Sequence, residues 1–285
     1  MVKRWGLIHM WRKLIERILA RSEARRMARY ACALLWVVSC GIPEAWAICD
    51  KDDFETRVSG EEQCLAMRRF GALQPETMVV WLHGDGNGAY HIPVAEKAGA
   101  DFSENRILSI ALIRPGYSDG AGNASSVHPR QSGRTDHYTK ENIAEVGRAI
   151  ERLRDHYRPE RIIFAGHSGG AATSAILLGF KPDLAVAALL VSCPCELVAW
   201  RAGRQMWSSS ENPTKWIDKI PTNARVIAMT GERDNNTFPS LGKNYSDALA
   251  ARSLKAEFRL VSGADHNGAF RSPMVLEALR DMLKK

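Results

Sequence analysis

From residue 77 onward, short runs of apolar residues alternate with segments of helical periodicity. The apolar runs are continuous, which is typical of strands covered on both faces of a sheet. The predicted strands are 77–84, 106–116, 161–168, 184–193, 224–231 and 255–263, and the predicted helices are 140–157, 170–180, 244–253 and 272–285. This order predicts an α/β fold with a doubly wound, mostly parallel sheet flanked by helices, in a single domain over 48–285.

Two features refine this pattern. Thr139 suits the N-cap of the first predicted helix, because its side chain can accept a hydrogen bond from the first turn. The segment 196–223 is longer than a connection between two elements needs, and it carries Trp200, Trp207 and Trp216. We predict a short lid or rim there.

The run "RIIFAGHSGGAATSAILLGF", residues 161–180, joins a predicted strand to a predicted helix through Gly-His-Ser-Gly-Gly. A sharp bend crowds the side chains beside its apex, and glycine at 166 and 170 removes that crowding. Ser168 is then expected at the carboxyl edge of the sheet with its hydroxyl accessible. The helix N-terminus behind it offers N–H groups and a partial positive charge to a developing oxyanion. The alternative interpretation is a plain glycine turn with an N-capping serine.

A serine hydroxyl becomes a good nucleophile only beside a base, normally a histidine that a carboxylate holds in place. Asp234 follows one of the later predicted strands, and His266 follows the last one. Both positions open onto the edge where Ser168 is expected, and the order Ser, Asp, His is that of nucleophile-elbow hydrolases. We therefore predict a triad of these three residues, with Glu232 as the alternative acid.

The loop "HGDGNGAYH", residues 83–91, follows the first predicted strand and can supply the second half of an oxyanion hole. Its glycines let the backbone turn N–H groups toward the nucleophile. We assign the donors to the backbone amide of Asp85 or Gly86, together with that of Gly169. His83 is interpreted as a residue that orders this loop.

Five motifs, "HGDG", "RPGYSDG", "GHSGG", "GERD" and "GADHN", lie between about residue 77 and the C-terminus. The set resembles the α/β-hydrolase superfamily, and more loosely its secreted esterases and prolyl-oligopeptidase-like members. The resemblance implies the α/β-hydrolase fold, Ser168 as nucleophile, Asp234 and His266 as its partners, and no cofactor. The chain departs from many members in having no large cap domain after Ser192.

The reaction that we expect is hydrolysis of a carboxylic ester, small or polymer-borne, through an acyl-enzyme. Peptidases of the superfamily commonly carry a gating domain, for which this chain has no room, so an amidase or peptidase is the alternative. Tyr117, His167 and Trp200 are candidate substrate-lining residues. Substrate identity and oligomeric state stay open.

Two other classes of protein are alternatives to a hydrolase. The run from Gly84 to Ala89 fits a dinucleotide-binding glycine fingerprint after a strand. That fingerprint should open directly into a helix, and "AYHIPVAEKAGA" is a poor helix start with Pro93 inside it. The second competitor is an inactive binding protein on a hydrolase scaffold.

The N-terminal residues have the pattern of a signal for export. Residues 1–47 hold nine of the 39 Lys and Arg and three of the 32 Asp and Glu, so they carry +6 of the net charge of +7. The rest of the chain is nearly neutral, which argues against a surface that binds nucleic acid. A basic region, the apolar run "ACALLWVVSCGI" and Ala-Trp-Ala predict a signal peptide over 1–47, with Met1 or Met27 as its start. We expect a periplasmic or secreted protein without membrane attachment, with a lipid anchor at Cys40 as the alternative.

Cysteine use agrees with export. Of the six cysteines, the four outside the predicted signal permit three pairings. A bond between Cys49 and Cys64 would close a loop of about 15 residues and contribute roughly 3 kcal/mol. Cys193 and Cys195 are either a second pair or two free thiols, and no cysteine and histidine spacing typical of a metal site occurs.

Overall fold

A computed structural model describes residues 49–86, 88–126 and 138–284 of the chain. The predicted signal peptide and the possible anchor at Cys40 lie outside the described residues, as does most of the polar loop after Tyr117. None of the helices that the described ranges form is long and apolar enough to cross a lipid bilayer.

An eight-stranded sheet forms the centre of the described chain, in the order β1-β2-β4-β3-β5-β6-β7-β8. Pairing from β4 through β8 is parallel, whereas β2 runs antiparallel to both β1 and β4. The strands are β1 Arg57–Ser59, β2 Cys64–Gly71, β3 Thr77–Leu82, β4 Ile107–Leu112, β5 Arg161–His167, β6 Ala187–Val191, β7 Arg225–Gly231 and β8 Lys255–Val261. The mostly parallel sheet that the sequence predicted is confirmed.

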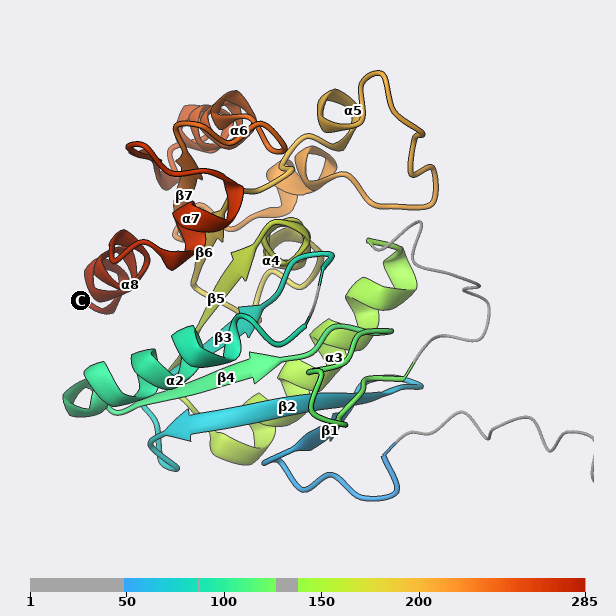
Figure 1. Cartoon of the computed structure of the whole chain (residues 1–285). Coiled ribbons are helices and arrows are strands. Elements are labelled where there is room, and N and C mark those ends of the chain that lie inside the picture. Colours follow the sequence, from blue (N-terminus) through green and yellow to red (C-terminus); the bar gives the residue numbers. More distant parts are fainter. Residues whose placement is uncertain (1–48, 87, 127–137, 285) are drawn as a thin grey trace, which may run out of the picture. The chain divides into compact units, whose positions relative to one another are not determined.

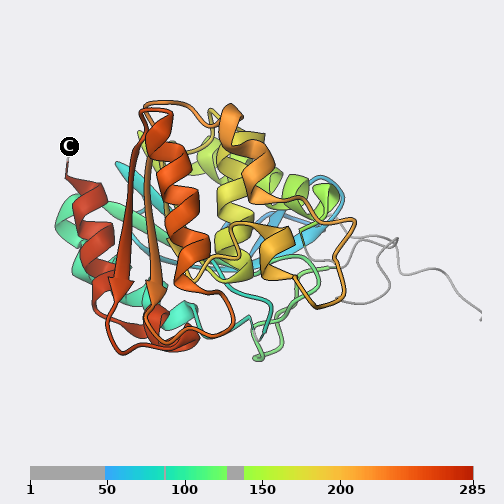
Figure 2. The ribbon, with the colours of Figure 1, turned by 90° about the horizontal axis from the view of Figure 1, so that it is seen from above.

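Helices cover both faces of this sheet. They are α2 Ile92–Asp101, α3 Lys140–Tyr157, α4 Gly169–Phe180, α5 Leu197–Trp200, α6 Pro239–Ala251, α7 His266–Arg271 and α8 Met274–Leu283, with 3₁₀ turns η1 Ser103–Asn105 and η2 Pro213–Lys219. One apolar cluster joins α3, α4 and α6 to the sheet, and a second joins α2, α7 and α8 to its other face. Figure 2 shows this layering, with α6 on one side of β7 and β8 and α8 on the other.

The parallel strands place the candidate site because their carboxyl ends meet at one edge. Ser168 follows β5 directly, and the loops after β7 and β8 carry Asp234 and His266. The glycine-rich loop after β3 leads to the same edge, beside α2 and β4 (Figure 1). Four loops far apart in the sequence therefore converge on one end of the sheet.

Two local predictions have different outcomes. Thr139 caps α3 as predicted, because its side chain accepts a hydrogen bond from the amide of Asn142 at 3.3 Å. The sequence expectation of a poor helix after the glycine loop was wrong, since α2 begins at Ile92. Pro93 lies in the first turn of α2, where no intrahelical partner exists for an N–H and the fixed φ of proline suits a helix.

Both cysteine pairs are oxidised. Cys49 and Cys64 form the predicted disulfide, which ties the start of the described chain to β2. Cys193 and Cys195 form a second disulfide across Pro194, just after β6. The sequence had left this second pair open.

Candidate active site

Ser168 stands at a strained bend between β5 and α4. Its backbone has φ 53° and ψ −119°, a conformation that residues with a side chain rarely adopt. The residue is 6% exposed, and the Gly169 amide behind it has no hydrogen-bond partner in the described part of the chain. A nucleophile beside a free helix N-terminal donor is the arrangement that acyl transfer needs.

The glycines around this bend are required by close backbone approach, as the sequence predicted. A Cβ on Gly166 would lie 2.3 Å from the carbonyl oxygen of Gly170, inside the turn itself. A Cβ on Gly170 would lie 2.0 Å from the carbonyl oxygen of Leu82 in β3. Strand and helix therefore pack at a distance that no side chain at either position allows.

The structure brings Asp234 and His266 together. Asp234 Oδ2 lies 2.9 Å from His266 Nδ1, although 32 residues separate them in the sequence. Two backbone amides, of Asn236 and Thr237, donate to the other carboxylate oxygen at 2.9 Å each. Burial alone would raise the pKa of Asp234, but its hydrogen bonds with His266 and Thr237 outweigh that effect and lower the pKa to about 2. The carboxylate is thus ionised and can orient the imidazole ring.

The His266 ring lies close to the bend that carries Ser168. Within the described ranges, no hydrogen bond joins Ser168 Oγ to His266 Nε2, and the amide Nδ2 of Asn236 lies 3.5 Å from that nitrogen. The ring centroid of His167, the residue before the serine, is 4.8 Å from that of His266. The absence of this bond from the described ranges is compatible with a serine and a base that engage only when substrate binds.

The alternative acid lies elsewhere. The Glu232 carboxylate accepts from the Gly263 amide at 2.7 Å and from the Ser262 hydroxyl at 3.1 Å. It therefore closes the turn after β8, and within the described ranges it makes no hydrogen bond or ion pair with His266. Asp234, rather than Glu232, is the carboxylate paired with the imidazole.

The glycine loop after β3 lies directly beside Ser168. A Cβ on Gly84 would be 3.0 Å from Ser168 Cβ, and one on Gly169 would be 2.1 Å from Asp85 Oδ1. Gly84 and the side chain of Asp85 are thus adjacent to Ser168 and Gly169, and a two-part oxyanion hole requires a loop in this place. His83 is buried, and its Nε2 accepts a hydrogen bond from the Arg114 amide at 2.9 Å.

The side chain of Asp85 belongs to a buried polar network that the sequence did not reveal. Arg114 Nη2 donates to Asp85 Oδ1 at 2.5 Å, and the Tyr138 hydroxyl donates to Oδ2 at 2.6 Å. The Arg114 guanidinium also lies over the Tyr117 ring, 4.9 Å from its centroid. The Arg114 guanidinium thus offsets the negative charge of the Asp85 carboxylate, which lies beside Gly169.

The three candidate substrate-lining residues are largely covered by protein. Tyr117, His167 and Trp200 are 3%, 2% and 8% exposed. Tyr117 belongs to the Asp85 network, and both ring nitrogens of His167 bond to protein groups. The indole N–H of Trp200 donates to the carbonyl of Asn236 at 3.0 Å, which links the predicted lid segment to the loop that carries Asp234.

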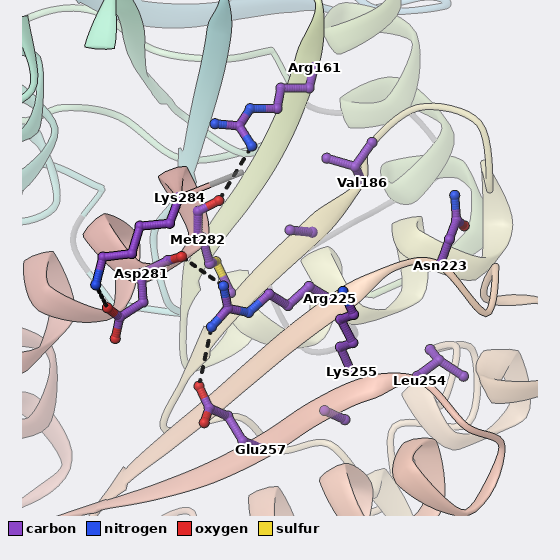
Figure 3. Close-up of a pocket in the computed structure, with 12 residues that line it drawn as sticks. Arg161, Val186, Asn223, Arg225, Leu254, Lys255, Glu257, Asp281, Met282 and Lys284 are labelled. Atoms are coloured by element: carbon purple, nitrogen blue, oxygen red, sulfur yellow. Dashed lines mark hydrogen bonds and ion pairs between the residues drawn. The ribbon is translucent and has the colours of Figure 1, made fainter. Parts of the chain in front are cut away.

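A large hollow lies at the opposite end of the sheet and has a structural explanation. Its volume is about 810 Å³, and it is lined by residues at the amino ends of β5, β6, β7 and β8 (Figure 3). Arg161 donates to the carbonyl of Leu283 at 2.8 Å, and Arg225 donates to that of Asp281 at 2.7 Å. These guanidinium groups cap the C-terminus of α8, so they are not available to a ligand.

No cluster of His, Cys, Asp or Glu suited to a metal ion occurs within the described segments.

Comparisons with known proteins identify the fold of this chain. No family model matches the chain, and no curated protein matches its sequence. Its structure is similar to that of an esterase from Pyrococcus furiosus, with TM-score 0.60, 13% identity, and 80% of this chain and 88% of that one covered. It is also similar to Est1E from Butyrivibrio proteoclasticus, solved with ferulic acid, with TM-score 0.61, 13% identity, and 80% and 97% covered.

A third similar structure is that of a Bacteroides ovatus protein assigned as a dipeptidyl aminopeptidase IV, with TM-score 0.59 and 13% identity. The match spans 78% of this chain and 33% of that one, so the likeness concerns one part of a larger protein. At this identity the comparisons show the fold alone. The chain has the α/β-hydrolase fold that its motifs predicted, and its strand order differs from the 3-2-1-4-5-6 order of dinucleotide-binding sheets.

Proposed function

We propose that the protein is an exported serine hydrolase that cleaves carboxylic esters. The observation that supports this most is the meeting of three loops at one sheet edge. Ser168 stands at a backbone bend with φ 53°, and Asp234 holds His266 at 2.9 Å beside it. A strained serine after β5 and an oriented imidazole after β8, at the same edge of the sheet, are the machinery of covalent acyl transfer.

In the proposed reaction, His266 Nε2 takes the proton of the Ser168 hydroxyl as the serine oxygen attacks the ester carbonyl carbon. The backbone amides of Gly169 and of Asp85 or Gly86 donate to the oxyanion. His266 returns the proton to the departing alcohol, which leaves an acyl-serine. Water then attacks the acyl carbon while His266 accepts its proton, and the acid is released with Ser168 restored. Asp234 stabilises the imidazolium and fixes the ring.

The share of each similar structure that this chain matches favours esters over amides as substrates. The two esterase structures are matched over 88% and 97% of their lengths, and the peptidase structure over 33%. Est1E was solved with ferulic acid, an aromatic acid, and the lid segment of this chain holds Trp200 and Trp207 with ring centroids 5.3 Å apart. Small or polymer-borne esters are therefore the substrates that we propose, and amide cleavage is the alternative.

The test is a panel of p-nitrophenyl acyl esters and aminoacyl anilides, hydrolysed by the wild type and by Ser168→Ala. We expect ester hydrolysis that falls by at least about 10³-fold in the variant. Hydrolysis of anilides alone would reassign the protein as a peptidase. Activity that survives in Ser168→Ala would contradict the proposed nucleophile.

Export is proposed on the predicted signal peptide and on the two disulfides, because such bonds persist mainly outside the cytosol. The mature chain is then expected to begin at Ile48. N-terminal sequencing of the protein from a periplasmic or culture fraction checks this. A protein recovered only from the cytosol with residues 1–47 attached would contradict export.

A further inference from the structure

Three hydrogen bonds in series connect the loops of the site behind Ser168. The Gly84 amide lies 2.5 Å from the Tyr90 hydroxyl, and that hydroxyl lies 2.7 Å from His167 Nδ1. His167 Nε2 lies 3.0 Å from the carbonyl oxygen of His266. The glycine loop, the serine bend and the base loop are thus joined by two side chains, although 182 residues separate Gly84 from His266.

The end groups and the charge state of His167 together fix the direction of each bond in this series. A backbone N–H can only donate, so the Tyr90 oxygen accepts from Gly84. A carbonyl oxygen can only accept, so His167 Nε2 carries a hydrogen and donates to His266. Burial, with a contribution from His266, lowers the pKa of His167 to about 3, so the ring is neutral and its one hydrogen is on Nε2. Nδ1 is then an acceptor, and the Tyr90 O–H donates to it.

Packing holds both side chains in place. Phe270 of α7 contacts the Tyr90 ring edge-on, with centroids 5.7 Å apart, and lies 4.9 Å from the His167 ring. The His266 carbonyl has a second donor, the Ser192 hydroxyl, at 3.2 Å. The backbone of His266 is therefore anchored, while its ring stays directed by Asp234.

We propose that Tyr90 and His167 are positioning residues that hold the oxyanion loop and the base loop in register around Ser168. This inference rests on the proposed function. The Gly84 amide precedes the predicted oxyanion donor at Asp85, and the His266 carbonyl belongs to the predicted base, so each end of the series controls one part of the machinery. A misplacement of about 1 Å at such a site can cost on the order of 10²-fold in rate.

The first test compares Tyr90→Phe with the wild type on the best p-nitrophenyl ester. Loss of one hydroxyl frees both the Gly84 amide and His167 Nδ1, so we expect kcat to fall about 10- to 50-fold with KM within about twofold. Tyr245→Phe is the matched control, because Tyr245 is buried in α6 and its hydroxyl has no hydrogen-bond partner among the described residues. That control should keep kcat within about twofold.

The second test is a double-mutant cycle with His167→Asn. If the two residues act through one series of bonds, Tyr90→Phe should lower kcat by less than about threefold in the His167→Asn background. Multiplicative effects, an unchanged kcat in Tyr90→Phe, or a change in KM alone would overturn the proposal. Absence of any Ser168-dependent hydrolysis in the wild type would instead overturn the proposed function, so the two failures are distinguishable.

A measurement on the wild type covers the case in which a variant does not fold. Nitrogen-15 NMR of the histidine rings distinguishes the two neutral forms and the charged form. The series predicts His167 neutral with its hydrogen on Nε2 from about pH 5 to 8. A hydrogen on Nδ1, or a charged His167 at neutral pH, would contradict the series.

Discussion

At the residue scale, the pairing of Asp234 with His266 is the contact on which the proposed chemistry depends most. The two side chains are 2.9 Å apart, and burial leaves the Asp234 side chain with no exposed surface. The sequence indicated both residues because each follows a strand end. It did not indicate Thr237, whose hydroxyl donates to the same carboxylate at 2.8 Å, because a threonine three residues after an aspartate in a loop carries no distinct pattern.

Replacing Asp234 with asparagine should lower kcat/KM on esters by about 10⁴-fold, because an amide cannot hold the His266 hydrogen on Nδ1. Glu232→Gln is the matched control, since among the described residues the Glu232 side chain accepts hydrogen bonds only from the turn at Ser262 and Gly263. Steady-state kinetics on both variants check this. Equal losses in the two variants would reassign the acid.

Asp234 should also make stability depend on pH. Its pKa lies near 2 in the folded chain, below its usual 3.8, so folding favours the charged form. The resulting stabilisation, about 2 kcal/mol, is present above about pH 4 and is lost as the pH falls toward 2. Urea unfolding from pH 6 to pH 2 should therefore show a steeper loss of unfolding free energy in the wild type than in Asp234→Asn. Parallel curves would contradict the low pKa.

At the element scale, the sequence predicted the helices and strands whose pattern is local. Helix α3 spans the predicted residues and is capped by Thr139. Helix α2 was missed because Pro93 was read as a breaker, when in a first turn it is favourable. The antiparallel strands β1 and β2 were missed because the disulfide, not an apolar run, marks that segment.

The contact between β3 and α4 gives a prediction at this scale. Gly170→Ala would place a Cβ 2.0 Å from the backbone oxygen of Leu82, so we expect the free energy of unfolding to fall by about 3 kcal/mol. Gly86→Ala is the control for stability, because its Cβ would meet nothing within 4 Å. Chemical denaturation measures both. A Gly170→Ala variant as stable as Gly86→Ala would contradict the close packing.

At the scale of the whole molecule, the fold explains why distant residues meet. Ser168, Asp234 and His266 were predictable because parallel strands share a carboxyl edge. The bonds from Tyr90 to His167 and from Asp85 to Arg114 span 77 and 29 residues, and only side-chain packing in three dimensions brings those partners together. Strand order follows from pairing across the sheet, which no local pattern specifies.

The disulfide between Cys49 and Cys64 should stabilise the whole described fold. It closes a loop of 15 residues, so replacing both cysteines with serine should lower the free energy of unfolding by about 3 kcal/mol under oxidising conditions. Urea denaturation measures this. With a reductant present throughout, wild type and variant should converge. Equal stability of the two oxidised proteins would contradict a stabilising role.

The central claim is that Ser168 is an activated nucleophile, and covalent labelling tests it most directly. The purified protein is incubated with a fluorophosphonate, digested and analysed by mass spectrometry. We predict one phosphonyl adduct, on Ser168, that is absent in Ser168→Ala and forms far more slowly in Asp234→Asn. An unlabelled Ser168, or an adduct on another residue, would contradict the account.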